Sequence, residues 1–277
     1  MKRKHKKKDG FFRQLESEFR RSKSTLILFV VFRTLVIAAG IRSLFLGNFE
    51  NAFLCALTLA LFLIPAFVSH TFKVELPTLL ENIVLIFIFA AEILGELNDY
   101  YIKYPLWDTM LHTATGFLAA AMGLSLIDLL NRSEKIKFNL SPFFVALVSF
   151  CFSMTIGALW EFLEFGADFL VQTDMQKDTV INTISSVALN PDATNVAVKI
   201  SGITETAVNG QVLAVNGYLD IGLYDTMKDM FVNFIGAAVF AVIGFFYAKY
   251  SGKSRSAGIV DGLRIKRRDA ENEENSG

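Results

Sequence analysis

Residues 142–171 read PFFVALVSFCFSMTIGALWEFLEFGADFLV, a long run that is apolar except for small hydroxyls and the carboxylates near its end. An α-helix rises about 1.5 Å per residue, so this run is long enough to cross the roughly 30 Å hydrocarbon core of a bilayer. The composition agrees, because 53% of the residues are hydrophobic and 27 are Phe. The mean hydropathy is +0.43. These values predict an integral membrane protein rather than a soluble domain.

Five more stretches meet the same criterion of length and apolar composition. The six predicted spans are Ser24–Leu46, Ala52–Val68, Leu76–Leu97, Leu106–Leu130, Pro142–Val171 and Asp225–Tyr250. The predicted fold is therefore an all-α transmembrane bundle of six helices occupying residues 24–250. An even number of spans places both ends of this membrane domain on one side of the bilayer.

The distribution of charge predicts which side that is. Ten Lys or Arg residues lie in the tail 1–23, and the connection 131–139 carries three more. The connections 47–51 and 98–105 carry only Lys103. Cytoplasmic segments are enriched in Lys and Arg, so both termini are predicted to be cytoplasmic. We expect the tail 1–23 to be solvated, or else to form a helix in the membrane interface, and the tail 251–277 to be disordered.

Overall, 27 basic residues balance 27 acidic ones, and this argues against binding to nucleic acid. The cysteines, Cys55 and Cys151, both lie in apolar runs. This position excludes a disulfide scaffold and a cysteine-based zinc site. Both are predicted to be small buried apolar groups.

The connection 172–223 is polar and much longer than an ordinary loop. Within it, residues 204–208 and 211–215 flank Asn209-Gly210, a pair typical of hairpin turns in which both residues need positive φ. We predict an extracytoplasmic insertion with a β-hairpin that caps the outer face. A flexible insertion is the alternative.

Ionisable residues recur inside the spans at helical spacing. Asp108 and His112 are four residues apart and share one helix face. In the fifth and sixth spans, spacings of three, four and seven align two further polar stripes. These are Glu161, Glu164 and Asp168, followed by Asp225, Asp229 and Asn233. The predicted topology brings all three stripes to the outer leaflet, together with Glu92, Glu96 and Arg42.

Two interpretations of this polar cluster remain open. It is either a hydrogen-bonded network that only holds the bundle together, or a functional site. As a site, the carboxylates of Glu161, Glu164, Asp225 and Asp229 would suit a divalent cation such as Mg²⁺, Ca²⁺ or Mn²⁺. Asp108, His112 and Glu161 would be the catalytic groups, with Asp108 orienting His112 as a general acid or base.

The motifs of these spans also show a family resemblance. Asp108-x-x-x-His112-x-x-x-Gly116-Phe117, then Glu161-x-x-Glu164, then Asp225-Thr226-x-x-Asp229-Met230 before Gly236-Ala237 resemble the YjdF-type bacterial inner-membrane proteins. More distantly they resemble the VanZ-like group. The resemblance implies a six-helix protein of the bacterial cytoplasmic membrane with no established activity, and the VanZ-like group points to the cell envelope.

The leading functional hypothesis is an outer-facing site that processes or binds a lipid or lipid-linked envelope precursor. Membrane lipids would then be its partners. Whether it is an enzyme stays open, because the sequence has no recognised nucleophile motif or phosphate-binding loop. The alternatives are a proton- or cation-linked transporter and a non-enzymatic envelope scaffold.

Overall fold

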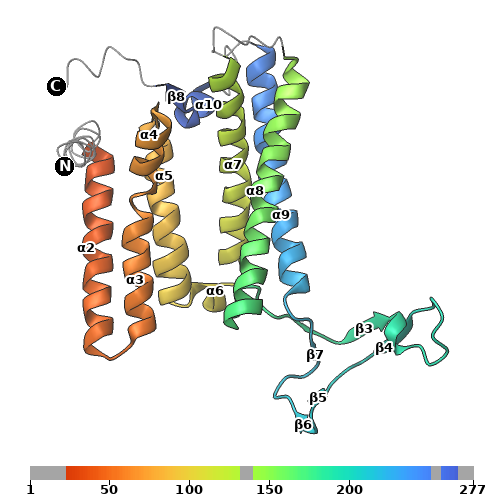
Figure 1. The fold of residues 1–277 in the computed structure, drawn as a ribbon. Coiled ribbons are helices and arrows are strands. Elements are labelled where there is room, and N and C mark those ends of the chain that lie inside the picture. The colour runs from red at the N-terminus through yellow and green to blue at the C-terminus, as the bar shows by residue number, and fades with distance from the viewer. Residues whose placement is uncertain (1–22, 132–139, 251–256, 268–277) are drawn as a thin grey trace, which may run out of the picture. The chain divides into compact units, whose positions relative to one another are not determined.

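The computed structural model describes residues 23–131, 140–250 and 257–267 (Figure 1). The chain divides into two compact units, which are described separately. The first unit comprises Met1–Met154 and Val232–Gly277, and the second comprises Thr155–Phe231. Six helical segments in the described part are long and apolar enough to cross a membrane. The predicted six-span fold is confirmed, whereas the prediction for the tail 1–23 lies almost entirely outside the described residues.

The structure gives the following helix bounds. The helices are α2 (Lys23–Phe45), α3 (Phe49–Leu61), α4 (Ile64–Phe72), α5 (Thr78–Ile88), η1 (Phe89–Leu97), α6 (Tyr100–Lys103), α7 (Trp107–Asn131), α8 (Pro142–Val171), η2 (Val187–Leu189), α9 (Leu223–Lys249) and α10 (Ala257–Leu263). All are α-helices except the π-helix η1 and the 3-10 helix η2.

The strands are short, and each has one partner. They are β1 (Val74–Glu75), β2 (Val180–Ile181), β3 (Thr183–Ser186), β4 (Val198–Ser201), β5 (Ala207–Val208), β6 (Gln211–Val212), β7 (Tyr218–Leu219) and β8 (Lys266–Arg267). The antiparallel pairs are β1 with β8, β2 with β7, β3 with β4, and β5 with β6.

The second span is interrupted, although the sequence analysis predicted one continuous helix. Helix α3 ends at Leu61 and α4 begins at Ile64. Pro65 lies in the first turn of α4 and has no backbone N–H, so it cannot continue the hydrogen-bond ladder of α3. The Leu63 N–H turns back to the Ala60 carbonyl at 3.0 Å, which closes the last turn of α3 tightly.

The third span changes its winding at Phe89, where α5 passes into η1. At the end of η1 the Asn98 amide donates to the Ile93 carbonyl, five residues earlier, at 2.5 Å. Gly95 faces the ring of Tyr101, which occupies the space that a Cβ would need. π-Helical turns are rare and occur often at functional sites, and η1 contains both Glu92 and Glu96.

Helices α7 and α9 approach each other closely in the first unit. A Cβ on Gly116 would collide with the Asn233 carbonyl oxygen, and one on Gly236 with the Thr113 carbonyl oxygen. Ala120 and Ala237, one turn and one residue beyond these glycines, are fully buried. Small residues thus let two helix backbones meet.

The segment after the sixth span is partly ordered, which corrects the prediction that residues 251–277 are disordered. Val260 and Leu263 of α10 are 1% and 3% exposed and belong to the same core cluster as Leu80, Leu124 and Phe240. Their spacing of three residues places them on one face of a helix. Two apolar residues among many charged ones are a weak sign of a helix in the sequence. Residues 268–277 lie outside the described part.

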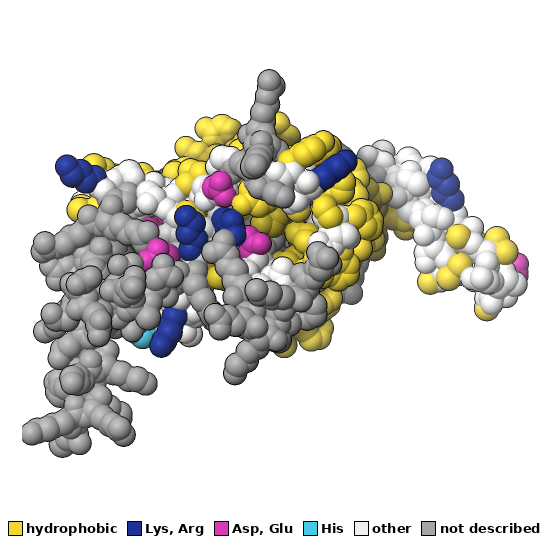
Figure 2. Space-filling model, turned by 90° about the horizontal axis from the view of Figure 1, so that it is seen from above, with side chains coloured by type: hydrophobic (Ala, Val, Ile, Leu, Met, Phe, Trp, Pro, Cys, Tyr) yellow, Lys and Arg dark blue, Asp and Glu magenta, His cyan; other side chains and the backbone are white. Residues whose placement is uncertain are grey.

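Polar contacts fasten the same segment to the ends of the helices. The Arg264 Nε lies 2.6 Å from an Asp128 carboxylate oxygen of α7. The Ile265 N–H donates to the Ser125 hydroxyl at 3.2 Å, and β8 pairs with β1. We call residues 257–267 the C-terminal strap. Figure 2 looks onto this end of the molecule, where Lys and Arg side chains lie beside acidic ones.

In the second unit, the predicted hairpin is present around Asn209-Gly210. The φ angles of 51° and 79° at these residues match a turn that requires two positive values. The paired strands β5 and β6 are shorter than predicted. The insertion also contains the β3–β4 and β2–β7 pairs, whose strands lie far apart in sequence and carried no local signal.

Candidate functional site

The clearest ionisable pair of the first unit lies in the first two turns of α7. The His112 Nε2 is 3.4 Å from an Asp108 carboxylate oxygen. The His112 side chain is 13% exposed and that of Asp108 is 22% exposed. Helical spacing predicted that they would meet, and the structure brings them together. A carboxylate at this distance can fix the orientation of the imidazole ring.

A second polar residue, Asn233 of α9, lies against Gly116, which is one turn after His112 on α7. Asn233 is 2% exposed, and its amide nitrogen is 3.6 Å from the Met154 sulfur. The Ser153 hydroxyl donates to the Gly116 carbonyl at 2.7 Å, and the Ser149 hydroxyl donates to the Ala120 carbonyl. Hydroxyl groups and small residues therefore already join α7, α8 and α9 of this unit without using the His112–Asp108 pair.

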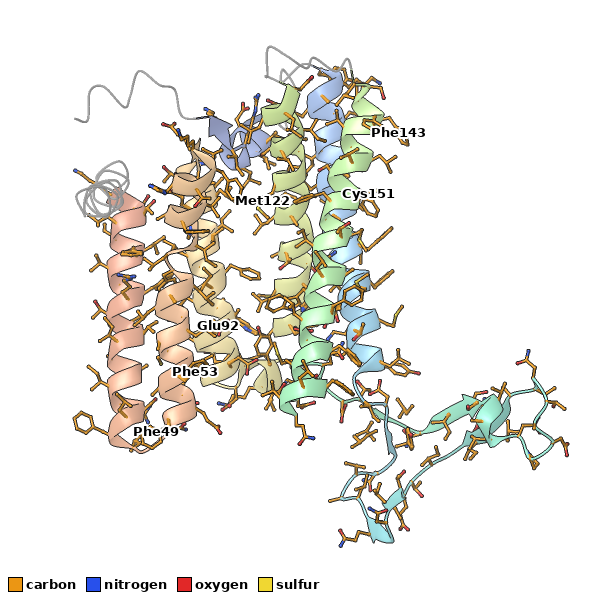
Figure 3. All side chains as sticks on the ribbon, viewed as in Figure 1. Phe49, Phe53, Glu92, Met122, Phe143 and Cys151 are labelled. Atoms are coloured by element: carbon orange, nitrogen blue, oxygen red, sulfur yellow. The ribbon has the colours of Figure 1, made fainter. Side chains whose placement is uncertain are left out.

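The third span contributes Glu92, which is partly buried, and Glu96, which is exposed. Figure 3 shows Glu92 in the half of the bundle nearer to α6, away from Met122 of α7. Arg42, which was predicted to lie in the same layer, is exposed in the last turn of α2 and forms no ion pair with the described carboxylates. Within this unit, Arg42 therefore does not neutralise a carboxylate of the polar cluster that the sequence predicted.

In the second unit, two of the predicted site residues hold the start of the insertion. The Asp168 carboxylate accepts hydrogen bonds from the Thr173 hydroxyl at 2.8 Å and from the backbone N–H groups of Met175 and Gln176 at 2.6 and 2.8 Å. The Asp225 carboxylate accepts from the Lys177 N–H at 2.9 Å. Both acids thus order a polar loop, a role that their helical spacing did not indicate.

The deeper acids of this unit are Glu161, Glu164 and Asp229, which are 5%, 8% and 1% exposed. The Trp160 ring N–H donates to Glu164 at 2.7 Å. The Lys228 ammonium lies 3.2 Å from Asp225 and 3.6 Å from Asp229. In the described part of this unit, the predicted ligands Glu161, Glu164, Asp225 and Asp229 do not converge on a common point. Binding of a divalent cation by this set stays a prediction.

Asp178, in the loop that leads into the insertion, has a shifted acidity. Burial raises its pKa, and the negative charges of Asp174, Asp220 and Asp168 raise it further. A hydrogen bond with the backbone of Gly222 acts in the opposite direction. Like charges therefore gather at the base of the insertion, where Asp220 also accepts from the Thr179 and Tyr224 N–H groups.

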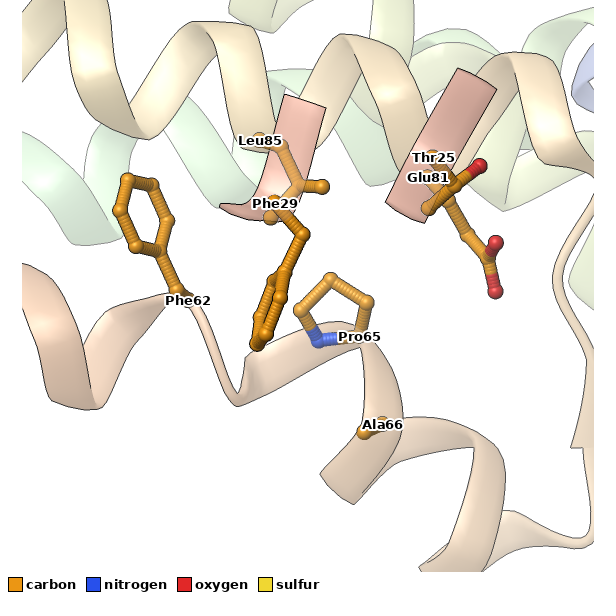
Figure 4. Close-up of a pocket in the computed structure, with 7 residues that line it drawn as sticks. All are labelled: Thr25, Phe29, Phe62, Pro65, Ala66, Glu81 and Leu85. Atoms are coloured by element: carbon orange, nitrogen blue, oxygen red, sulfur yellow. The ribbon is translucent and has the colours of Figure 1, made fainter. Parts of the chain in front are cut away.

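A small cavity that the sequence did not indicate lies in the first unit beside the break between α3 and α4 (Figure 4). Its volume is about 30 Å³, enough for a water molecule. The lining residues come from α2, α4, α5 and the α3–α4 break: Thr25, Phe29, Phe62, Pro65, Ala66, Glu81 and Leu85. The Arg33 guanidinium lies over the buried ring of Phe29, 4.3 Å from its centroid, and reaches the Leu59 carbonyl at 3.5 Å. Arg33 therefore contacts a carbonyl oxygen close to the break.

The comparison with protein families identifies the relatives of this chain. A model of the family described as "Predicted membrane protein (DUF2238)" matches residues 24–250, which is the whole predicted membrane domain. The chain belongs to this family. The match agrees with the resemblance to YjdF-type uncharacterised membrane proteins, whereas the VanZ-like link stays a prediction. No curated protein and no solved structure matches the chain.

Proposed function

We propose that this membrane protein binds or processes a lipid or lipid-linked envelope precursor at a site built around His112 and Asp108. The proposed orientation places both termini in the cytoplasm of a bacterium and the site in the outer half of the cytoplasmic membrane. The proposal rests on the predicted loop charges and on one structural observation. That observation is a histidine–carboxylate pair, partly accessible, inside a membrane-spanning helix.

Placing the His112–Asp108 pair inside a membrane costs free energy. An ionisable side chain within a span costs a few kcal/mol on insertion scales, so such residues mostly serve a pathway or a site. The alternative to a functional site is that the pair only holds helices together. Gly116, Gly236 and the hydroxyls of Ser149 and Ser153 already serve that purpose. A histidine oriented by a carboxylate is also the group best suited to move a proton near neutral pH.

The sequence further predicts that carboxylates of the fifth and sixth spans join this pair and bind a divalent cation. In that form, the cation would neutralise a lipid phosphate and His112 would act as the general acid or base. Without the cation, the same pair would support binding alone. Metal dependence therefore separates a metal-assisted enzyme from a lipid-binding protein.

The test uses the full chain in detergent with a bacterial lipid extract. Lipids bound to the protein and any change in their structure are measured by mass spectrometry for the wild type, His112→Gln and Asp108→Asn. Glu50→Gln is the matched control, because it replaces an exposed acid in the first turn of α3 that belongs to neither candidate site. We expect the first two variants to lose bound or converted lipid and the control to keep it. Equal behaviour of all variants would contradict the proposal.

Orientation is tested separately by accessibility to a membrane-impermeant thiol reagent. Cysteines introduced at Asn98 and Asn209 should react on intact cells, and one introduced at Lys135 should react only after lysis. The native Cys55 and Cys151 are first replaced by Ser or Ala. Labelling of Lys135→Cys alone would invert the topology and move the pair to the cytoplasmic half.

A second candidate function, proton- or cation-linked transport, is favoured by the third span. Glu81 lies beside the cavity near one end of this span, and Glu92 and Glu96 lie in its π-helical end. The neighbouring second span is interrupted at the same cavity, and interrupted helices are common at ion sites of transporters. Proteoliposomes loaded with a pH-sensitive dye test this candidate: Glu81→Gln and Glu92→Gln should each abolish any proton flux that the wild type shows.

A further inference from the structure

The short connection between η1 and α7 concentrates aromatic rings in a fixed arrangement. The ring of Tyr100 packs edge to face against that of Tyr104, with centroids 4.7 Å apart, and against that of Trp107, with centroids 5.0 Å apart. The interplanar angles are 62° and 80°. We call these three residues the aromatic turn. The faces of such rings carry the negative part of the aromatic quadrupole.

The backbone of this connection is held by its own contacts. Asp99 has a positive φ of 58° and starts α6. The Lys103 ammonium binds the Asp99 carboxylate at 3.0 Å and the Asn98 carbonyl at 2.8 Å. The Trp107 N–H donates to the Tyr104 carbonyl at 2.9 Å. The rings are therefore presented by a defined loop, and the one lysine of the loop already has a carboxylate partner.

The apolar residues beside the rings indicate what surrounds them. Ile102 is 77% exposed and Leu106 is 69% exposed, although both lie within a few residues of a membrane-spanning helix. These two apolar side chains lie among three aromatic residues in the sequence. An apolar surface of this kind would be unfavourable in water. Tyr and Trp are enriched where a membrane protein meets the headgroup region. The composition of the aromatic turn is therefore typical of a segment at the level of lipid headgroups.

Charge then selects the kind of headgroup. Between residues 92 and 112 the chain has four carboxylates, on Glu92, Glu96, Asp99 and Asp108, against the single Lys103. Asp108 directly follows Trp107 and keeps 22% of its side chain exposed. Ring faces attract cations, and ammonium groups are bound by aromatic rings combined with carboxylates. The one lysine of the connection is already paired with Asp99, so the connection offers an anionic headgroup no further lysine or arginine.

We propose that the aromatic turn, together with Asp108, binds the ammonium group of a zwitterionic membrane lipid of the phosphatidylethanolamine type. This inference rests on the proposed function, since it names the class of lipid that would reach the His112–Asp108 pair. The lipid is preferred over a soluble amine because Ile102 and Leu106 need an apolar neighbour that only the acyl region supplies. Tyr104, which is 52% exposed, is the ring most open to the headgroup.

The test compares headgroups on the full chain. Native mass spectrometry measures the lipid adducts formed at equal concentrations of phosphatidylethanolamine and phosphatidylglycerol with the same acyl chains. Both headgroups carry a phosphate, but only the first carries an ammonium group. We expect the wild type to prefer phosphatidylethanolamine. Tyr104→Leu keeps an apolar side chain but removes the ring, and it should reduce that preference about fivefold, as expected for one cation–π contact. Tyr104→Phe keeps the ring and should retain the preference.

A matched control separates headgroup binding from general anchoring. Tyr224, at the start of α9, is 55% exposed and lies outside the aromatic turn. Tyr224→Leu should leave the lipid preference unchanged. Equal losses in Tyr104→Leu and Tyr224→Leu, a wild-type preference for phosphatidylglycerol, or an unchanged preference in Tyr104→Leu would overturn the inference. Competition by soluble phosphoethanolamine as strong as that by the lipid would also overturn it.

The outcome is distinguishable from failure of the proposed function. If His112→Gln loses bound or converted lipid while Tyr104→Leu keeps its headgroup preference, the headgroup inference falls and the proposed function stands. If Tyr104→Leu loses the preference while His112→Gln changes nothing, the aromatic turn binds lipid but the proposed site at His112 is refuted. Thermal unfolding of each variant confirms that the fold is retained.

Discussion

The contact between α7 and α9 allows a sharp test, because the added atom would meet backbone and not a movable side chain. In Gly116→Ala and Gly236→Ala the new methyl group collides with a carbonyl oxygen of the opposite helix. The helices must separate, and Ser153 and Asn233 must shift with them. Overpacking of this kind costs about 1–3 kcal/mol. The better helix propensity of Ala returns roughly 1 kcal/mol of this.

The expected net loss is therefore about 0–2 kcal/mol, or a decrease of up to roughly 30-fold in the folding equilibrium constant. Unfolding by SDS in mixed micelles measures it. Gly166→Ala in α8 is the control, because no atom lies within 4 Å of its added Cβ. It should be neutral or stabilised by about 0.5–1 kcal/mol. The double variant Gly116→Ala/Gly236→Ala should lose less stability than the two single variants lose together, since one separation of the helices accommodates both methyl groups. Stability of all variants equal to that of Gly166→Ala would refute the close contact.

Three further predictions concern the strap, the insertion and the metal. Leu263→Ala should destabilise the first unit by about 2–4 kcal/mol in the same SDS assay, because it empties a buried position of the C-terminal strap; a change below about 0.5 kcal/mol would mean that the strap is not docked. The folded-state pKa of Asp178 lies above its unfolded-state value, so stability should fall as pH rises from the usual carboxyl pKa through the raised one. Asp178→Asn should flatten this dependence and stabilise the insertion at neutral pH, which melting curves between about pH 4 and pH 7 will show. If a divalent cation binds, Mg²⁺, Ca²⁺ or Mn²⁺ should raise the melting temperature, a chelator should reverse the gain and Glu161→Gln should abolish it; no effect between about pH 6 and pH 8 would contradict the metal prediction.

The spans were predictable from sequence because membrane insertion depends on length and hydrophobicity, which are local properties. Pro142–Val171 has the same bounds in the structure as in the prediction, and the Asn209-Gly210 turn followed from two adjacent residues. The break at Phe62–Leu63 and the π-helix η1 were missed. Pro65 was a visible signal for the break, since a proline in a helix removes a donor. The π-helix has no periodic signature in the sequence, and neither does the contact of the Asn98 amide with the Ile93 carbonyl at its end.

The candidate site also has contacts that the sequence predicted and contacts that it did not. Asp108 and His112 meet because both lie on one helix, where spacing alone fixes the geometry. Asp168 and Asp225 were grouped with the site by their spacing, but their partners are backbone N–H groups of residues 175–177. Hydrogen bonds from a loop backbone leave no trace in residue type. Contacts between segments distant in sequence, such as β1 with β8, were likewise invisible.

The C-terminal strap has a consequence for how the protein is made. Residues 257–267 emerge from the ribosome after all six spans have been synthesised, yet they complete the core that contains Leu80 of the third span. The early helices can insert, but their ends stay exposed until this late segment docks on them. Chains that stop before residue 257 would leave an apolar surface beside the uncovered Asp128 carboxylate. Docking of the strap is therefore a late step of folding, because it covers this apolar surface and pairs Arg264 with Asp128 only after the six spans have been made.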